Sequence, residues 1–367
     1  MSSYAAIRVL ATVALVGVMS VAHVDARARA EEDTQAQLEV RITEFQLPTS
    51  GALPGGIVVG SDGALWFYET GSNQIGRIST DGQITEFPIL TANASQPNQG
   101  FLAVGPDGAI WFTENRSVSL GRLTPDGQMS EMPIDLVVRN HAPNATPNPL
   151  LGVTAAADGD LWFNGAMSNS LWRLGTDGQT TEFILPTPGA TPAGIVAGSY
   201  GALWFAEPTA NQIGRITTDG SILEYGIPTP GSYAVRLTVG PDGAVWFAEI
   251  RGNKIGRITS GGEVREYGVP GMTPVGIAAG PDGAIWFTGY GSNEIGRMSL
   301  DGVVDRFALP TPASVPYHIV TGPDGALWFT EQAGNKIGRL EIPVANAPAV
   351  VSAATRLEAL LTISGDL

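Results

Sequence analysis

The sequence has no cysteine in its 367 residues, and only 15% of its residues are charged. The absence of cysteine excludes a disulfide scaffold, a thiolate nucleophile and a cysteine-ligated metal. Basic residues are few, since 20 Lys and Arg stand against 35 Asp and Glu, which gives a net charge of −15. Nucleic-acid binding needs a basic surface, so we expect no nucleic-acid partner. The acidic surface indicates either simple solvation or attraction of a cation or cationic ligand.

Long apolar runs are also missing, apart from one near the N-terminus. The run Val9–Val21 follows a single charge, Arg8, and its 13 residues are too few to span a bilayer. Small-residue cleavage patterns follow, ending at Ala30 or alternatively at Ala26. This arrangement is typical of a secretory signal peptide. We therefore predict a signal peptide over residues 1–30, a secreted or periplasmic mature protein, and no membrane span.

Glycine and proline are abundant, with 47 and 26 residues, and they separate copies of a repeat. The copies are marked by seven Trp-Phe pairs, which begin at Trp66, Trp111, Trp162, Trp204, Trp246, Trp286 and Trp328. A recurring period of about 42 residues is typical of repeat architectures. The clearest copy, residues 240–270, contains four short β-rich runs separated by turn residues. Asp-Gly precedes the Trp run in six of the seven copies and is absent at Ser199-Tyr200-Gly201, and this dipeptide indicates a hairpin.

Each copy therefore predicts a four-stranded antiparallel meander. Such a sheet cannot bury both faces alone, and radial stacking of the copies would bury them. We predict an all-β, seven-bladed β-propeller over residues 31–342, self-sufficient as a monomer, followed by a tail over residues 343–367 that is disordered or forms a short docked helix. Insertions at residues 91–100 and 135–149 lengthen two links between blades.

A strand at the N-terminus predicts how the ring closes. Residues 41–48 have the pattern of the fourth strand of a blade, yet they precede the first Trp unit. No good fourth strand follows the last unit, which ends near Leu340. We therefore expect the N-terminal strand to complete the last blade.

Two charged residues recur in register with the tryptophans. An Arg lies eleven residues after every one of them, at Arg77, Arg122, Arg173, Arg215, Arg257, Arg297 and Arg339. We expect each Arg to stack on its Trp across a hairpin and to be structural. A Glu lies three residues after the Trp in five copies, at Glu69, Glu114, Glu207, Glu249 and Glu331. These carboxylates either serve turns and ion pairs or ring one mouth of the channel, where Glu331 and Glu249 would be metal ligands.

Two copies replace a glycine with a functional side chain where the first strand begins. The glycine is replaced by Arg236 in the fifth copy and by His318 in the seventh, next to Tyr317. A departure from an internal repeat costs packing and invites a reason. Arg236 and Tyr317 are therefore candidate ligand-binding residues and His318 a candidate catalytic base, although a lone histidine is also compatible with a satisfied surface residue.

The segments Gly322–Glu331 and Gly334–Leu340, with their sister copies over about residues 40–341, resemble the virginiamycin B (streptogramin B) lyase family. The resemblance implies a seven-bladed propeller and a Mg²⁺-dependent carbon–oxygen lyase that opens cyclic depsipeptide antibiotics by elimination. It also implies functional histidines at the positions of Val275 and Tyr317, a metal-binding Glu at Val315 and a Tyr at Gly55. Glu331 is the one counterpart present, so four of five implied positions differ.

Three hypotheses follow. The first is an exported lyase-like propeller that binds a ligand or partner at the channel mouth without the family's usual catalytic residues. The second is a metal-dependent lyase or lactone hydrolase of altered specificity, with Glu331 and neighbouring carboxylates around Mg²⁺ or Ca²⁺ and His318 as base. The third is a structural propeller without a ligand site.

Overall fold

A computed structural model describes residues 38–94, 100–114, 118–134 and 150–342. The predicted signal peptide, the insertion at residues 135–149 and the tail at residues 343–367 lie outside these ranges. The only helical element among the described residues is the 3₁₀ turn η1 (Ser199–Gly201). None of the described helical structure is long and apolar enough to cross a membrane.

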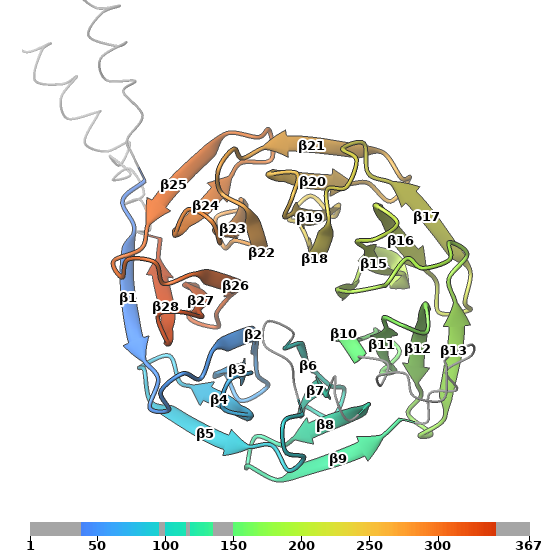
Figure 1. Cartoon of the computed structure of the whole chain (residues 1–367), viewed down its shortest axis with the longest axis horizontal. Coiled ribbons are helices and arrows are strands. Elements are labelled where there is room, and N and C mark those ends of the chain that lie inside the picture. The colour runs from blue at the N-terminus through green and yellow to red at the C-terminus, as the bar shows by residue number, and fades with distance from the viewer. Residues whose placement is uncertain (1–37, 95–99, 115–117, 135–149, 343–367) are drawn as a thin grey trace, which may run out of the picture. The chain divides into compact units, whose positions relative to one another are not determined.

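Seven antiparallel sheets of four strands each are arranged around a central axis, so the predicted seven-bladed propeller is confirmed (Figure 1). The innermost strand of each blade, called strand a, is β2 (Pro54–Val59), β6 (Leu102–Val104), β10 (Leu150–Ala155), β14 (Ile195–Ala197), β18 (Ala234–Val239), β22 (Pro274–Ala279) or β26 (Pro316–Thr321). Strand b is β3 (Leu65–Glu69), β7 (Ile110–Glu114), β11 (Leu161–Gly165), β15 (Leu203–Glu207), β19 (Val245–Glu249), β23 (Ile285–Gly289) or β27 (Leu327–Glu331).

The outer half of each blade contains strands c and d. Strand c is β4 (Gln74–Ile78), β8 (Ser119–Leu123), β12 (Ser170–Leu174), β16 (Gln212–Ile216), β20 (Lys254–Ile258), β24 (Glu294–Met298) or β28 (Lys336–Glu341). Strand d, on the rim, is β5 (Ile84–Pro88), β9 (Met129–Pro133), β13 (Thr180–Ile184), β17 (Ile222–Gly226), β21 (Val264–Gly268), β25 (Val304–Ala308) or β1 (Arg41–Gln46).

The N-terminal strand closes the ring as predicted. β1 pairs antiparallel with β28, from Arg41 opposite Glu341 to Gln46 opposite Lys336. The seventh sheet therefore has the order β1-β28-β27-β26, and its rim strand comes from the other end of the propeller sequence. No covalent bond holds this closure, since the chain has no cysteine.

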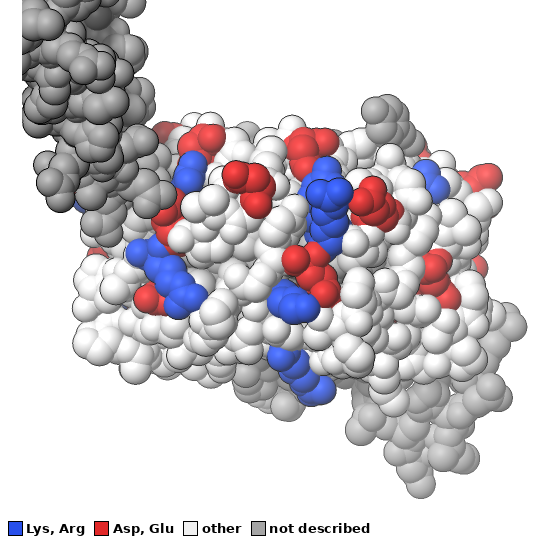
Figure 2. Space-filling view, turned by 90° about the horizontal axis from the view of Figure 1, so that it is seen from above, with Lys and Arg blue, Asp and Glu red and all other residues white. Residues whose placement is uncertain are grey.

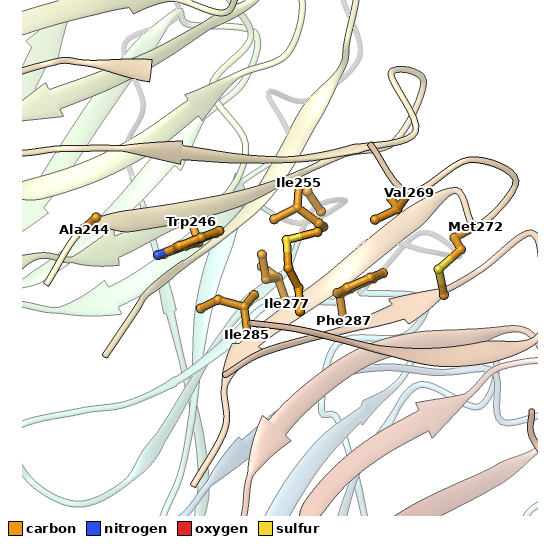
Figure 3. Packing of buried hydrophobic residues seen from close by; sticks show 10 residues of the cluster. Ala244, Trp246, Ile255, Val269, Met272, Ile277, Ile285 and Phe287 are labelled. Atoms are coloured by element: carbon orange, nitrogen blue, oxygen red, sulfur yellow. The ribbon is translucent and has the colours of Figure 1, made fainter. Parts of the chain in front are cut away.

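The core lies between neighbouring blades. In Figure 3, Trp246 and Ile255 of the fifth blade pack against Ile277, Ile285 and Phe287 of the sixth, and all five are nearly or fully buried. Each blade thus covers the face that its neighbour cannot bury alone. Charged side chains lie on the surface. On the side seen in Figure 2, acidic and basic side chains are interspersed and form no single basic patch.

The glycine of strand c lies against a Phe ring of strand b. A Cβ on Gly256 would lie 2.1 Å from ring carbons of Phe247, and each corresponding glycine contacts the equivalent Phe of its own blade. A Cβ at this position would overlap the Phe ring unless the ring moved, which explains the glycine in six copies. The third copy is the exception, because Trp172 stands opposite Phe163.

The recurring Arg is structural, as predicted, and it acts together with an Asp that the sequence analysis had assigned only to a turn. Asp242 accepts hydrogen bonds from Trp246 Nε1 at 3.0 Å and from Arg257 Nε at 2.6 Å. The Arg257 guanidinium lies 5.8 Å from the Trp246 ring centre, a cation–π contact of about 0.5–2 kcal/mol. The same two hydrogen bonds converge on Asp62, Asp107, Asp282 and Asp324.

A second repeated contact joins neighbouring blades at five junctions of the described chain. Glu266 on β21 accepts hydrogen bonds from the backbone N–H and hydroxyl of Thr229, which follows the preceding blade. Equivalent pairs are Thr49 with Glu86, Thr91 with Glu131, Thr187 with Glu224, and Thr311 with Glu44. At these junctions adjacent blades are connected on the rim as well as in the core.

Candidate functional site

A bulge near the start of strand a decides where the candidate residues point. In β26, Pro316 pairs with Glu331 and Ile319 with Phe329, so Tyr317 and His318 lie together opposite one residue of β27. The same register shift occurs in the a strands of four other blades: β2, β10, β18 and β22. A bulge re-aims the side chains on either side of it. The bulge therefore sets the directions of the two side chains at the start of each of these strands.

The two bulge positions line two different cavities in the channel. The mouth pocket, of about 330 Å³, lies where strands a begin and strands b end, and it is lined by Phe101, Leu151, Thr191, Ala193, Pro208, Tyr233, Val235, Ile250, Thr273, Val275, Tyr290 and Tyr317. The inner pocket, of about 350 Å³, is lined by strand a residues that include Gly56, Gly194, Arg236 and His318. Val235 and Tyr317 therefore face the mouth, whereas the next residues, Arg236 and His318, face the inner pocket.

The mouth pocket is apolar and aromatic. Among the described residues that line it, none is charged. The Tyr290 and Tyr317 rings meet edge to face at 6.5 Å, and the Arg251 guanidinium lies 4.2 Å from the Tyr233 ring centre. Aromatic walls of this kind provide apolar contact area together with phenolic hydroxyl groups. The pocket is suited to a ligand that carries rings.

Arg236 occupies the boundary between the two pockets. Its side chain is almost completely buried, with the residue 4% exposed. The guanidinium lies 4.5 Å from the Phe101 ring centre and 5.1 Å from that of Tyr317. Its Nε and Nη2 atoms are buried without a hydrogen-bond partner in the described part of the chain. Arg236 thus presents a desolvated positive charge to the channel.

His318 joins the last blade to the first. The imidazole Nδ1 accepts a hydrogen bond from the backbone N–H of Ile57 at 2.9 Å, and the backbone N–H of His318 donates to Thr330 Oγ1. Burial lowers the pKa of His318 well below its usual value, and the charge of Arg236 acts in the same direction. The imidazole is therefore neutral with its proton on Nε2. The nitrogen that could accept a proton, Nδ1, already accepts a hydrogen bond from the backbone, which supports a structural role for His318. Its role as a catalytic base stays a prediction.

The glycine that these residues replace is explained by the neighbouring blade. A Cβ on Gly276 would lie 2.6 Å from the carbonyl oxygen of Tyr317, and the Gly194 N–H donates to the Val235 carbonyl at 2.9 Å. Inner strands of adjacent blades approach too closely at these glycines for a side chain. The other three blades have Phe101, Arg236 and His318 at this position, and these residues depart from the packing of the repeat.

The recurring glutamates point elsewhere. Glu331 and Glu249 are fully buried, and neither lines the mouth pocket or the inner pocket. Burial raises the pKa of Glu331 to about 7 and that of Glu249 to about 8, with the charges of Glu44 and Glu266 on the rim strands acting in the same direction. Of the two roles that the sequence left open, turn and ion-pair contacts or a ring around the channel mouth, the burial of these two side chains favours the first.

A metal site is not formed by these carboxyls. Within the described ranges, no group of three His, Cys, Asp or Glu residues is placed to hold a metal ion. A carboxyl with a raised pKa is also a poor ligand because it holds a proton. These carboxyls do not fit the Mg²⁺ that the resemblance implies, nor the Ca²⁺ of the second hypothesis, and a bound metal stays a prediction.

Three predicted residues, Arg236, Tyr317 and His318, are thus brought together, and Glu331 and Glu249 are not. The sequence analysis missed Tyr233 and Tyr290 of the mouth pocket. Each stands at a repeat position where other copies have different residues, for example Thr191 and Thr273 in place of Tyr233. Comparing copies at these two positions, as was done for Arg236 and His318, could have found them.

Comparison with known proteins agrees with this geometry. The model of the virginiamycin B lyase family matches residues 26–144 and 101–347. A streptogramin B lyase structure is 38% identical over 84% of this chain and 100% of that chain, with a TM-score of 0.77. This chain belongs to the virginiamycin B lyase family.

Two other structures mark the range of similarity around this family member. A catalytically inactive histidine-to-alanine variant of virginiamycin B lyase from Staphylococcus aureus, with quinupristin, is 36% identical over 82% of this chain and 99% of that chain, with a TM-score of 0.75. A gluconolactonase from Xanthomonas campestris is 17% identical over 84% of this chain and 92% of that chain, with a TM-score of 0.52. The second likeness is one of fold alone.

Proposed function

We propose that this chain is an exported member of the virginiamycin B lyase family that binds an apolar, ring-bearing ligand at its channel mouth without opening it. The observation that carries this proposal is the lining of the mouth pocket. Tyr233, Tyr290 and Tyr317 surround it together with apolar side chains, and no charged residue of the described chain lines it. Aromatic walls with few polar groups are typical of pockets that bind small molecules.

The absence of cleavage is supported by two positions in the same pocket. The resemblance implies histidines where this chain has Val275 and Tyr317, and both side chains line the mouth pocket. Elimination at an ester needs a base for the α-proton and a cation to stabilise the enolate. A valine and a tyrosine do not replace two imidazoles, and His318 faces the inner pocket instead.

Family membership favours an alternative, a metal-dependent lyase or a lactone hydrolase of altered specificity. Quinupristin, the ligand named with the Staphylococcus aureus relative, is a suitable probe for both functions. The full chain is titrated with quinupristin by calorimetry. The ligand is then analysed by chromatography with mass detection after incubation with Mg²⁺ or EDTA. Elimination gives a product of unchanged mass and new retention, whereas hydrolysis adds one water.

We expect saturable binding, unchanged quinupristin, and the same result with Mg²⁺ and EDTA. Tyr290→Ala should weaken binding about tenfold, which corresponds to about 1.4 kcal/mol. The control Leu223→Ala, on the rim and 52% exposed, should bind as the wild type does. Product formation that EDTA abolishes would establish the alternative. No binding would overturn the proposed ligand class, and equal binding by the two variants would overturn the assignment to the mouth pocket.

A further inference from the structure

We propose that the inner pocket is a second, separate site, which binds the carboxylate of a small and otherwise apolar organic acid through Arg236. The mouth pocket and the inner pocket share Phe101 but are otherwise lined by different residues. The proposal concerns a different ligand group from that at the mouth, and it can hold or fail independently of the proposed function.

The first argument is the charge of Arg236. The side chain is buried, and two of its nitrogens have no hydrogen-bond partner in the described part of the chain. No Asp or Glu is among the residues that line the inner pocket. An uncompensated buried charge is costly to the fold. A ligand with a negative charge would supply the missing partner.

The second argument is that the guanidinium contacts two aromatic rings. Phe101 and Tyr317 lie within cation–π distance, at 4.5 Å and 5.1 Å from ring centre to guanidinium carbon. Stacking uses the faces of the planar group and leaves the N–H edges for hydrogen bonds. The edges of arginine match a carboxylate in a bidentate pair, which is a strong form of hydrogen bonding. The aromatic pair thus holds Arg236 ready for such a ligand.

The third argument is the neighbour on the other side of the ring. His318 lines the same pocket, and its Nδ1 is bonded to the Ile57 N–H. This leaves Nε2–H as a neutral donor toward the pocket. The two polar side chains that replace the glycine of the repeat, Arg236 and His318, therefore both bring hydrogen-bond donors to one cavity.

The remaining side chains that line the inner pocket indicate what the uncharged part of the ligand is. Most of the remaining side chains are aliphatic, and they include Val58, Leu102, Val153, Val196 and Leu237. Such walls do not replace the hydration shell of an inorganic phosphate, but they fit a carboxylate attached to a hydrocarbon group. A volume of about 350 Å³ is near the lower end for ligand pockets, so the acid must be small.

Benzoate and its neutral counterpart benzamide test the proposal directly, because they share a shape and differ in charge. Each is titrated into the full chain by calorimetry, in buffers with and without chloride or inorganic phosphate. We expect benzoate to bind at least tenfold more tightly than benzamide, and chloride and phosphate to compete only weakly. Equal binding of benzoate and benzamide, no binding of benzoate, or equal competition by inorganic ions would each overturn the carboxylate assignment.

Variants identify the residue. Arg236→Gln should weaken benzoate binding at least tenfold, and Arg236→Lys, which keeps the charge but loses the planar fork, should lie between it and the wild type. Arg265→Gln is the matched control, because Arg265 is exposed on the rim strand β21, with its side chain 65% exposed. Ile250→Ala, at a residue that lines the mouth pocket and not the inner pocket, should leave benzoate binding unchanged. Equal affinity of Arg236→Gln and Arg265→Gln would overturn the role of Arg236.

Discussion

In five blades the aspartate of the Asp-Gly turn connects strands b and c by hydrogen bonds. Asp242 accepts hydrogen bonds from the indole of Trp246 and the guanidinium of Arg257. Burial raises the pKa of Asp242, but these hydrogen bonds outweigh it and hold the pKa below its usual value. One side chain thus satisfies a donor on strand b and another on strand c. Its removal leaves a fully buried indole N–H without an acceptor.

We predict that Asp242→Ala lowers the free energy of unfolding by about 1–3 kcal/mol, because a buried donor loses its partner. Urea unfolding followed by tryptophan fluorescence measures this change. Glu263→Ala is the control, because Glu263 pairs only with Arg265 and both side chains are 65% exposed. The control should change stability by less than about 0.5 kcal/mol. If the two variants were equally stable, the structural role of the aspartate would be refuted.

At the scale of the element, closure by β1 can be compared with a blade that has the same contacts but continuous sequence. Glu44 on β1 accepts hydrogen bonds from the Thr311 N–H and hydroxyl, and from Lys336 Nζ at 2.7 Å. Glu266 on β21 makes the same three contacts, with Thr229 and with Lys254 Nζ at 2.8 Å. The side chains match, but only β21 is joined by a turn to the strand beside it.

We predict that Glu44→Ala and Glu266→Ala lower stability by similar amounts, about 1.5–3 kcal/mol each, because each removes charge-assisted hydrogen bonds. Their local effects should differ. Hydrogen exchange should become faster in β28 of Glu44→Ala, because β1 can detach without opening a turn, and should change little in β20 of Glu266→Ala. Equal exchange in β28 and β20 would show that the strand from the N-terminus is held as firmly as the others.

At the scale of the whole molecule, buried carboxyl groups are repeated around the ring. Burial raises the pKa of Glu69 and Glu331 to about 7, and that of Glu207 and Glu249 to about 8. In each case a glutamate on the rim strand adds to the shift. The folded state therefore binds protons that the unfolded chain releases above about pH 4.5.

A carboxyl whose pKa is raised in the folded state contributes its full stabilisation at pH values below its pKa in the unfolded chain. This contribution is lost as the pH rises through its pKa in the folded state. We predict that the free energy of unfolding falls between pH 5 and pH 9, with a slope of up to about 1.4 kcal/mol per pH unit for each such carboxyl. Urea unfolding at several pH values measures it. Glu207→Gln should be more stable than the wild type at pH 9 and close to it at pH 5. Equal stability of the wild type at both pH values would contradict this prediction.

The sequence by itself determined the seven blades, the closure by residues 41–48, and the pairing of Trp with Arg. These features depend on local turn chemistry and on a period that recurs seven times, both of which are visible in one dimension. It also singled out Arg236, Tyr317 and His318, because a repeat shows its own exceptions.

Only the tertiary structure decided where the recurring glutamates and the exceptions point. Tyr317 lines the mouth pocket and the next residue, His318, lines the inner pocket, and only the assembled ring shows that these two cavities exist. The glutamates lie inside the blades instead of around the channel. The physical reason is that these directions depend on backbone register and on the neighbouring blade, whose inner strand lies within hydrogen-bond distance. The sequence of one repeat does not show where the next blade packs against it.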